Sequence, residues 1–221
     1  MNFSFAKDNC FCISLMNKDD RWLKMQERFT KINLDVTRFP AAMGGTNDIT
    51  DNFDPRLNNG QKGCSQSHIN LCRHILNKNI PYALILEDDA CFDKNWKDKL
   101  DVFYKDINDN DWDIIFLNAS EPSYPLDKWV IAKEQFLTGG YIISFRGAKK
   151  ILEMFGGHNC YLSSDWMTSR IQLYDHSYCY FPWLIIQEGN ESIIGSGFVE
   201  DHKKVLKCLN EINYDLDNYV I

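Results

Sequence analysis

The stretch that decides the fold is residues 81–90, PYALILEDDA, in which an uncharged run ends in three consecutive carboxylates. Such a run suits a strand buried on both faces, and ligand sites in open α/β sheets lie beyond the carboxyl ends of such strands. If strand geometry continues, Glu87 and Asp89 lie on one side, about 6–7 Å apart, with Asp88 on the other. The pair could hold one Mg²⁺ or Mn²⁺ ion. The alternative is a solvated strand end with helix-capping acids.

Composition indicates one compact domain over residues 1–221. With 44% hydrophobic and 14% aromatic residues, the chain can bury one sizeable core. No segment has the roughly 20 apolar residues that cross a bilayer, and residues 1–8 lack the pattern of a signal peptide. We therefore expect a cytoplasmic protein without a transmembrane segment, either free or at a cytosolic membrane face. A formal charge of −7 argues against nucleic acid as a main partner.

The eight cysteines are expected to be reduced and mostly core-filling, because the chain is long and shows no export signal. Cys64, His68 and Cys72 recur every four residues on an expected helix, so a soft-metal site is conceivable. The chain has no paired C-x-x-C motifs, which favours the core-filling interpretation.

Short apolar runs alternate with amphipathic stretches along the chain, which is typical of βαβ units. Strands are expected at residues 11–16, 36–39, 81–86, 112–117, 136–145 and 178–187. Helices are expected from a cap at Asp19 or Asp20 to about residue 32, at 67–77, 92–107 and 147–155, from a cap at Ser163 or Ser164 to 174, and at 199–212. Residues 44–63 and 119–134 lack periodicity and are expected to be loops, the second a candidate lid.

The chain also carries a series of short blocks. They are CISL at 12–15 with Asp20-Arg21, FPAAMG at 39–44, GCSQSH at 63–68, LEDD at 86–89, WDIIFL at 112–117, GYIIS at 140–144 with Gly147-Ala148, then Asp165 and Gln187. In content and order these blocks resemble glycosyltransferase family 25, the lipooligosaccharide and collagen galactosyltransferase type. The resemblance covers roughly residues 11–194, and its specificity lies in the joint order of the blocks.

The resemblance implies a GT-A-type (Rossmann-like) fold, a single α/β sandwich with a mostly parallel central sheet flanked by helices. It implies transfer of a hexose, galactose or glucose, from a UDP-sugar to a glycan or hydroxylated protein acceptor, with inversion. The implied cofactor is Mn²⁺, or Mg²⁺. Such an ion would offset the negative charge that grows on the departing diphosphate.

The resemblance also assigns roles to individual residues. Asp89 and Glu87 would bind the metal, and Asp165 would be the catalytic base that activates the acceptor hydroxyl. The donor-binding set is Ser14, Arg21, His68, Glu87 and Asp88, and the acceptor-binding set is Gly140, Tyr141, Asp165 and Trp166. Ordinary structural roles are the alternatives: helix stabilisation for Asp165, a surface position for Arg21, a satisfied histidine at His68, and packing for the others.

The chain departs from the family pattern at three places. Ser14 stands where the family usually has Asn, Met43 where it often has Asp, and Ser163-Ser164 where a proline commonly precedes the acid. These changes affect the expected sugar more than the expected reaction. Rich usage of Asn, Lys and Ile suits an AT-rich genome, that of a bacterium or a large DNA virus. Two rival functions remain, a glycoside hydrolase using paired carboxylates and a catalytically silent sugar- or nucleotide-binding module.

Overall fold

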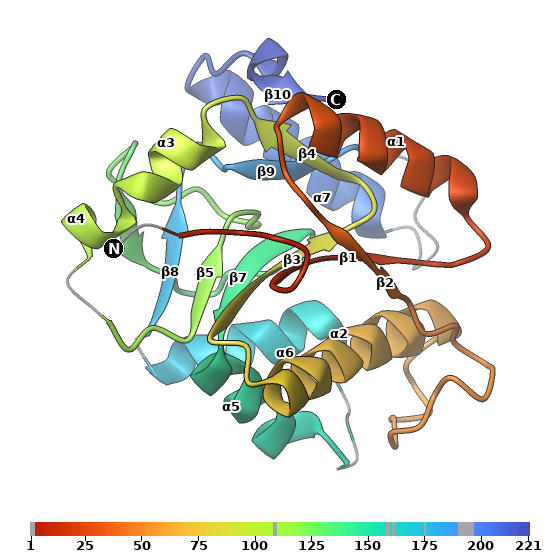
Figure 1. Ribbon diagram of the computed structural model, residues 1–221. Coiled ribbons are helices and arrows are strands. Elements are labelled where there is room, and N and C mark those ends of the chain that lie inside the picture. The colour runs from red at the N-terminus through yellow and green to blue at the C-terminus, as the bar shows by residue number, and fades with distance from the viewer. Residues whose placement is uncertain (1–2, 108–109, 158–159, 161, 175, 190–196) are drawn as a thin grey trace.

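The computed structural model describes residues 3–107, 110–157, 160, 162–174, 176–189 and 197–221. Within them, the strands form two sheets (Figure 1). The larger sheet has seven strands in the order β2-β1-β3-β7-β5-β8-β6. They are β1 (Cys10–Ser14), β2 (Thr37–Pro40), β3 (Tyr82–Glu87), β5 (Ile114–Phe116), β6 (Trp129–Ile131), β7 (Gly140–Ser144) and β8 (Ser177–Tyr180). The smaller sheet, in the order β10-β4-β9, consists of β4 (Ala90–Asp93), β9 (Ile185–Gln187) and β10 (Tyr219–Val220).

Most strands of the larger sheet run in one direction. β1 is parallel to both β2 and β3, and β5 is parallel to β8. β7 lies between these two groups and is antiparallel to β3 and to β5, while β6 is antiparallel to β8 at the edge. Helices cover both faces of the sheet. The expected α/β class, with a mostly parallel central sheet flanked by helices, is therefore confirmed.

The helices divide between the two faces of the larger sheet. α2 (Asn59–Lys78), α5 (Phe145–Phe155) and α6 (Ser164–Ile171) lie on one face in Figure 1, and α1 (Asp19–Lys31) and α3 (Trp96–Asp101) lie on the other, together with the smaller sheet. The remaining described helices are α4 (Phe103–Asp106), α7 (Gly197–Glu211) and short 3-10 helices at Gln172–Tyr174 and Leu216–Asn218.

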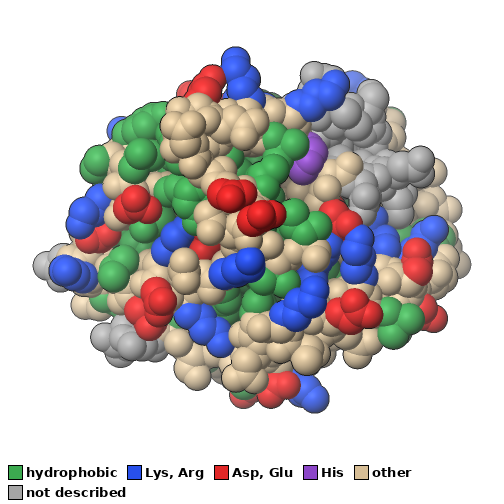
Figure 2. All heavy atoms as spheres, turned by 90° about the horizontal axis from the view of Figure 1, so that it is seen from above, with side chains coloured by type: hydrophobic (Ala, Val, Ile, Leu, Met, Phe, Trp, Pro, Cys, Tyr) green, Lys and Arg blue, Asp and Glu red, His purple; other side chains and the backbone are tan. Residues whose placement is uncertain are grey.

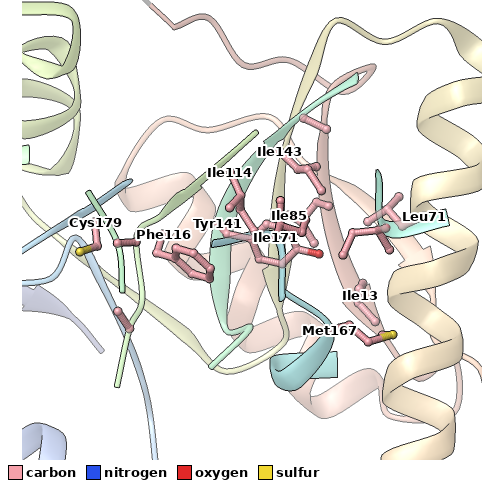
Figure 3. Close-up of a cluster of buried hydrophobic side chains, with 14 of the residues drawn as sticks. Ile13, Leu71, Ile85, Ile114, Phe116, Tyr141, Ile143, Met167, Ile171 and Cys179 are labelled. Carbon is pink, nitrogen blue, oxygen red and sulfur yellow. The ribbon is translucent and has the colours of Figure 1, made fainter. Parts of the chain in front are cut away.

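β3 is buried on both faces, as its uncharged sequence predicts. Leu84 and Leu86 pack in the core with residues of α1 and α3, while Ala83 and Ile85 pack in the core with residues of α2 and α5. Figure 3 shows Ile85 among the side chains of that second core, with Leu71 reaching it from α2. Burying each Leu or Ile side chain contributes about 1.5–3 kcal/mol, so these alternating contacts fix the register of β3 at the centre of the fold.

α2 begins eight residues earlier than the sequence analysis placed it, so the expected loop at 44–63 is wrong over its last five residues. The physical reason is a capping box at its start. The Asn58 side chain accepts a hydrogen bond from the Gln61 amide, and the Gln61 side chain accepts one from the Asn58 amide. These two bonds satisfy amides that would otherwise lack partners at the start of the helix.

Three other expected elements are wrong. The single helix expected at 92–107 is instead β4 followed by the short helices α3 and α4, because Phe92 pairs with Ile185 of β9 and Val220 of β10. The strand expected at 178–187 is divided into β8 and β9, which belong to different sheets. The loop expected at 119–134 contains β6, which pairs with β8.

The cap expected at Asp19 or Asp20 is also wrong, whereas the N-cap position expected at Ser163 is confirmed. α1 begins after Lys18 without a side-chain cap, and Asp19 and Asp20 lie within its first turn, where their charges still favour the helix N-terminus. At α6, Ser163 occupies the N-cap position without a side-chain cap bond.

The surface shows no concentration of one charge on the face that carries α1 and the smaller sheet. Figure 2 shows acidic and basic side chains interspersed there with apolar ones. Among the described residues, no helix is both long and apolar enough to cross a bilayer. All eight cysteines are free, and six of them are buried.

Candidate functional site

A pocket of about 230 Å³ opens beside the carboxyl ends of β1 and β3. Its wall includes the loop between β1 and α1, the turn at residues 41–44, the first turns of α2 and the three carboxylates that follow β3. Two glycines let these segments meet. A Cβ on Gly44 would lie 1.7 Å from the Asn59 carbonyl oxygen, and one on Gly63 would lie 2.6 Å from the Ala42 carbonyl oxygen. The 41–44 turn therefore packs directly against the α2 backbone.

The three acids lie on one rim of this pocket. β3 ends at Glu87, and Asp88-Asp89 form a turn into β4, so the alternation expected for a continuing strand does not apply. All three line the pocket. Arg21 of α1 approaches them, with Nη2 2.5 Å from Asp88 Oδ1 and 3.7 Å from Asp89 Oδ2. The structure thus brings Arg21, Glu87, Asp88 and Asp89 together, as the sequence analysis proposed for the metal and donor sites.

Gln187 joins two of the acids. Its Nε2 donates to Asp89 Oδ1 at 3.2 Å and lies 3.3 Å from Glu87 Oε2. β9 places the side chain there, because Gln187 pairs with Ala90, the residue that follows the acid turn. Gly139 packs closely against the Gln187 side chain, since a Cβ at position 139 would lie 2.6 Å from Gln187 Cγ.

Glu87 is held by a hydrogen-bond network of side chains from α2, from β7 and from the segment just before β7. His68 of α2 has Nε2 3.2 Å from Glu87 Oε1, and its Nδ1 is 2.7 Å from the hydroxyl of Tyr141 in β7. The Thr138 hydroxyl donates to the same carboxylate oxygen at 2.7 Å. Burial raises the pKa of Glu87, but the hydrogen bond and charge of His68 outweigh it, and the net shift is downward. Glu87 is therefore a carboxylate at neutral pH.

Asp89 has the opposite shift. Burial, followed by the neighbouring charge of Glu87, raises the pKa of Asp89 to about 7. Burial also raises the pKa of Asp88, against the charge of Arg21. Carboxylates crowded in this way are stabilised by a cation that supplies the missing positive charge. Their oxygen donors suit Mg²⁺ or Mn²⁺, so the donor set fits the ion that the sequence resemblance implies.

Cys64 also approaches Glu87, beside Gln187, His68 and Thr138. Its Sγ is 3.8 Å from Glu87 Oε1 and 3.1 Å from the hydroxyl of Ser164 at the start of α6. Burial raises the pKa of this thiol well above its ordinary value. The trio suggested by the sequence does not assemble, because Cys72 lies in the core and Glu87 joins Cys64 and His68 in its place.

Asp165 lies in the first turn of α6 and does not line the pocket. Its Oδ1 accepts hydrogen bonds from the Ser163 hydroxyl at 2.5 Å and the Trp166 amide at 2.9 Å. The preceding residue, Ser164, contacts Cys64 on the pocket wall. Trp166 is 45% exposed and packs on Phe136, with ring centroids 4.7 Å apart. Asp165 and Trp166 therefore form a partly exposed surface next to the pocket wall.

The other predicted residues divide between pocket and core. Ser14 ends β1 and lines the pocket. Gly140 and Tyr141 are buried in β7, and Tyr141 reaches the acid cluster only through His68. A Cβ on Gly140 would lie 2.5 Å from Ile185 Cδ1, so packing accounts for that glycine.

Some residues of the site were not identified from the sequence. Lys18 lines the pocket at the start of α1, and Thr138 and Ser164 contact Glu87 and Cys64. Lys18 had a usable signal, since it follows a strand and directly precedes a helix. Ser164 had been noted only as a departure from the family pattern before Asp165, and Thr138 had no signal, because only the tertiary fold brings it to the acids.

An α/β sheet with an acidic pocket at the carboxyl ends of its strands is the arrangement of a nucleotide- or sugar-binding protein. The chain belongs to glycosyltransferase family 25 (LPS biosynthesis protein), whose sequence model matches residues 7–128. Among its relatives, procollagen galactosyltransferase 1-A of Xenopus laevis is 30% identical over 170 residues, which cover 66% of this chain and 28% of that protein. A glycosyltransferase 25 family member of Aedes aegypti is 29% identical over 166 residues, covering 65% of this chain and 27% of the relative.

The chain therefore spans about 28% of the length of the curated relatives it matches. Among solved structures, a glycosyltransferase involved in the glycosylation of the major capsid of PBCV-1 aligns over 90% of this chain and 98% of its own. Its sequence identity is 9% and the TM-score is 0.36, which is too low to support an argument about this site.

Proposed function

We propose that this chain transfers a hexose from a UDP-sugar to a hydroxyl group of a glycan or a hydroxylated protein, with a divalent ion at the acid turn. The observation that carries the proposal is the group of three carboxylates faced by Arg21 on the rim of the pocket. A site with this surplus of negative charge binds an anionic nucleotide only together with a cation. Family membership and relatives named as galactosyltransferases favour galactose as the sugar.

Asp89 and Glu87 are the proposed ligands of Mn²⁺ or Mg²⁺, with Asp88 held beside them by Arg21. When bound, the ion supplies positive charge to the diphosphate that leaves the sugar. Gln187 keeps the two ligand carboxylates together, since its amide nitrogen lies within hydrogen-bonding distance of both. Thr138 and His68 hold the other oxygen of Glu87, Oε1, so the orientation of this carboxylate is set by bonds to three side chains.

The nucleotide is proposed to occupy the pocket between the acid turn and the 41–44 turn. Ser14 and the 41–44 turn form a wall of mostly small residues that would contact the uridine. Lys18 and Arg21, which also line the pocket, would interact with the phosphates through their positive charges. Lys18 also stands at the N-terminus of α1, where the helix dipole favours an anion.

Asp165 is the proposed base, and its side chain acts on the acceptor. It stands on the α6 side of Cys64, next to the exposed ring of Trp166, which is suited to stacking on a sugar. Inversion requires a base on the face of the sugar opposite the departing diphosphate. In this arrangement the donor fills the pocket and the acceptor approaches over α6.

The deciding experiment compares wild type with Asp89→Ala in calorimetric titrations with UDP-galactose and UDP-glucose, with and without Mn²⁺. We expect wild type to bind one of these donors only with the metal, and Asp89→Ala to lose this metal-dependent binding while staying folded. A ligand at 100 times its dissociation constant adds about 2.7 kcal/mol to stability, so thermal shifts provide a second measurement. Asp98→Ala, which removes an exposed acid from α3, is the matched control.

Three results would reject the proposal. Unchanged donor affinity in Asp89→Ala would remove the metal from the acid turn. Hydrolysis of a simple glycoside that survives a chelator would instead establish the hydrolase alternative. Donor binding without transfer to any acceptor hydroxyl would establish a silent binding module.

A further inference from the structure

Three different metal-binding side chains gather at the inner wall of the pocket. Among the described residues, Cys64, His68 and Glu87 each offer one ligand atom, and all three atoms lie within 4.8 Å of one another. Cys64 and His68 are four residues apart on α2 and therefore project from the same face of the helix. Glu87 reaches them from the end of β3. The set combines sulfur, nitrogen and oxygen, which distinguishes it from the all-oxygen group at Asp88 and Asp89.

Two of the three distances between these atoms are close to the edges of a tetrahedral zinc site, and all three lie within 4.8 Å. With Zn–N and Zn–O bonds of about 2.0–2.1 Å and Zn–S of about 2.3 Å, a tetrahedron has N–O edges of about 3.3 Å and S–O edges of about 3.6 Å. The corresponding separations are 3.2 Å between His68 Nε2 and Glu87 Oε1, and 3.8 Å between Cys64 Sγ and the same oxygen. An ion would therefore require only small shifts of these side chains.

The surroundings orient the ligands as they do in known zinc sites. His68 Nδ1 is 2.7 Å from the Tyr141 hydroxyl, which orients the ring, and an ion bound at Nε2 would replace the present contact between Nε2 and Glu87 Oε1. Thr138 donates to the Glu87 carboxylate at 2.7 Å. His68 is 2% exposed, whereas Cys64 and Glu87 line the pocket, so an ion could enter from the pocket and keep its fourth position open toward it.

We propose that Cys64, His68 and Glu87 form a second cation site. This site binds zinc or another soft divalent ion, whereas the site proposed at Asp89 binds a hard ion. Binding converts the Cys64 thiol to a thiolate, and its proton is released to solvent. Soft thiolate and imidazole ligands select zinc over Mg²⁺ and Mn²⁺.

This site has a consequence for the neighbouring acids. A zinc ion held by Glu87 Oε1 engages the carboxylate that Gln187 otherwise couples to Asp89. Zinc should therefore weaken Mn²⁺ binding at the acid turn and inhibit transfer. The predicted inhibition rests on the proposed function, whereas the predicted zinc binding does not. An experiment can therefore reject either prediction without rejecting the other.

The test uses the metal-free full chain and zinc alone, with calorimetric titration in competition with a chelator of known affinity. We expect one zinc ion per chain, and a loss of affinity of more than about 100-fold in Cys64→Ala, because even indirect partners of a metal are worth 10–100-fold. Cys72→Ala is the matched control, since Cys72 lies two helical turns further along α2 in the core. It should keep wild-type zinc affinity.

A second measurement needs no variant. Co²⁺ added to the wild-type chain should give the intense absorption of a thiolate–cobalt bond and the visible bands of tetrahedral coordination, and both should be absent in Cys64→Ala. Circular dichroism and thermal unfolding establish that each variant is folded.

The proposal is overturned if zinc does not bind, or if it binds wild type and folded Cys64→Ala equally. It is also overturned if zinc affinity depends on Asp89 alone, as shown by its loss in Asp89→Asn and its retention in Cys64→Ala. That result would mean that zinc simply occupies the acid turn.

Discussion

Arg21 pairs with Asp88 on the rim of the pocket, with Nη2 2.5 Å from Oδ1. The same nitrogen is 3.7 Å from Asp89, so this cation is shared between two carboxylates. The side chains of Arg21 and Asp88 are 26% and 14% exposed, which leaves the pair open to water and to ligands. Arg21 would therefore compete with the proposed metal for the acid turn.

Removing this competition should strengthen metal binding. We expect Arg21→Gln to bind Mn²⁺ about five- to tenfold more tightly than wild type without nucleotide, because a partly exposed ion pair is worth about 1 kcal/mol and 1.4 kcal/mol is tenfold. Isothermal calorimetry measures the change. Arg56→Gln, which removes the exposed pair with Asp54, is the control and should leave Mn²⁺ affinity unchanged. Weaker Mn²⁺ binding in Arg21→Gln would show that the arginine orients the acids and does not compete for them.

Gln187 should stabilise the metal-free protein. In Gln187→Leu, Glu87 and Asp89 lose the amide nitrogen that lies 3.3 Å and 3.2 Å from their oxygens. We expect a loss of about 1–3 kcal/mol in the free energy of unfolding, the usual cost of leaving a buried polar group without its partner. Urea titrations measure this loss, and saturating Mn²⁺ should reduce it by offsetting the carboxylate charge. Equal losses with and without Mn²⁺ would place the metal elsewhere.

Asp165 should act in transfer and not in donor binding. We expect Asp165→Asn to keep the affinity for the UDP-sugar and Mn²⁺ but to lower kcat by at least about 100-fold, the range of a lost general base. The change also removes a charge from the first turn of α6, which costs about 0.3–1 kcal/mol. Asp98→Asn makes the equivalent change in the first turn of α3 and should leave kcat intact. Normal turnover in Asp165→Asn would assign the residue to helix stabilisation.

Asp51 anchors the loop before α2 and should make stability depend on pH. Its oxygens accept from Arg73 at 2.6 and 2.7 Å, and its side chain is 3% exposed. Burial raises the pKa of Asp51, but the hydrogen bonds from Arg73 and Gln66 outweigh it, and the net shift is downward. Its contribution is therefore fully present above the unfolded-state pKa of about 3.9 and is lost as pH falls through the lower folded-state value.

We expect Asp51→Asn to lower the free energy of unfolding at pH 7 by about 2 kcal/mol, the scale of hydrogen bonds to charged groups. The difference from wild type should shrink as the pH falls below about 4. Urea unfolding over a pH series measures both effects. Asp98→Asn, at an exposed position in the first turn of α3, is the control and should show no comparable loss. A difference that stays constant with pH would mean that packing, and not charge, anchors the loop.

The centre of the fold was predictable because its residues are buried on both faces. The uncharged run that ends at Glu87 suits a central strand, and the structure confirms it as β3 with the acids at the edge of the sheet. Strand direction was not predictable. β7 is as apolar as its neighbours yet runs antiparallel to them, since nothing in its composition records the direction of the chain. The start of α2 was readable, because Asn58 and Gln61 have the spacing of a capping box.

The candidate site was predictable in part. Glu87 and His68 come together as expected of donor-side residues, while Cys72, at the right helical spacing, does not join them. Helical spacing predicts which side chains share a face of a helix. It does not predict which other element packs against that face. Thr138 and Ser164 reach the site from segments far along the chain, and neither belongs to a periodic pattern. β4 was missed because Cys91 and Phe92 form only a short apolar run before charged residues.

The acid turn is also the covalent link between the two sheets, since it joins β3 of the larger sheet to β4 of the smaller one. Gln187 on β9 reaches back across that link to the acids. A ligand that bridges Glu87 and Asp89 would add to the contacts between the two layers, which already include a hydrogen bond from the Ile185 amide to the Leu117 carbonyl. Amide hydrogen exchange should then slow throughout the smaller sheet, including β10 at the far end of the chain, when donor and metal bind. Ligand binding in the pocket would thus be detected as slower amide exchange in strands far from the pocket itself.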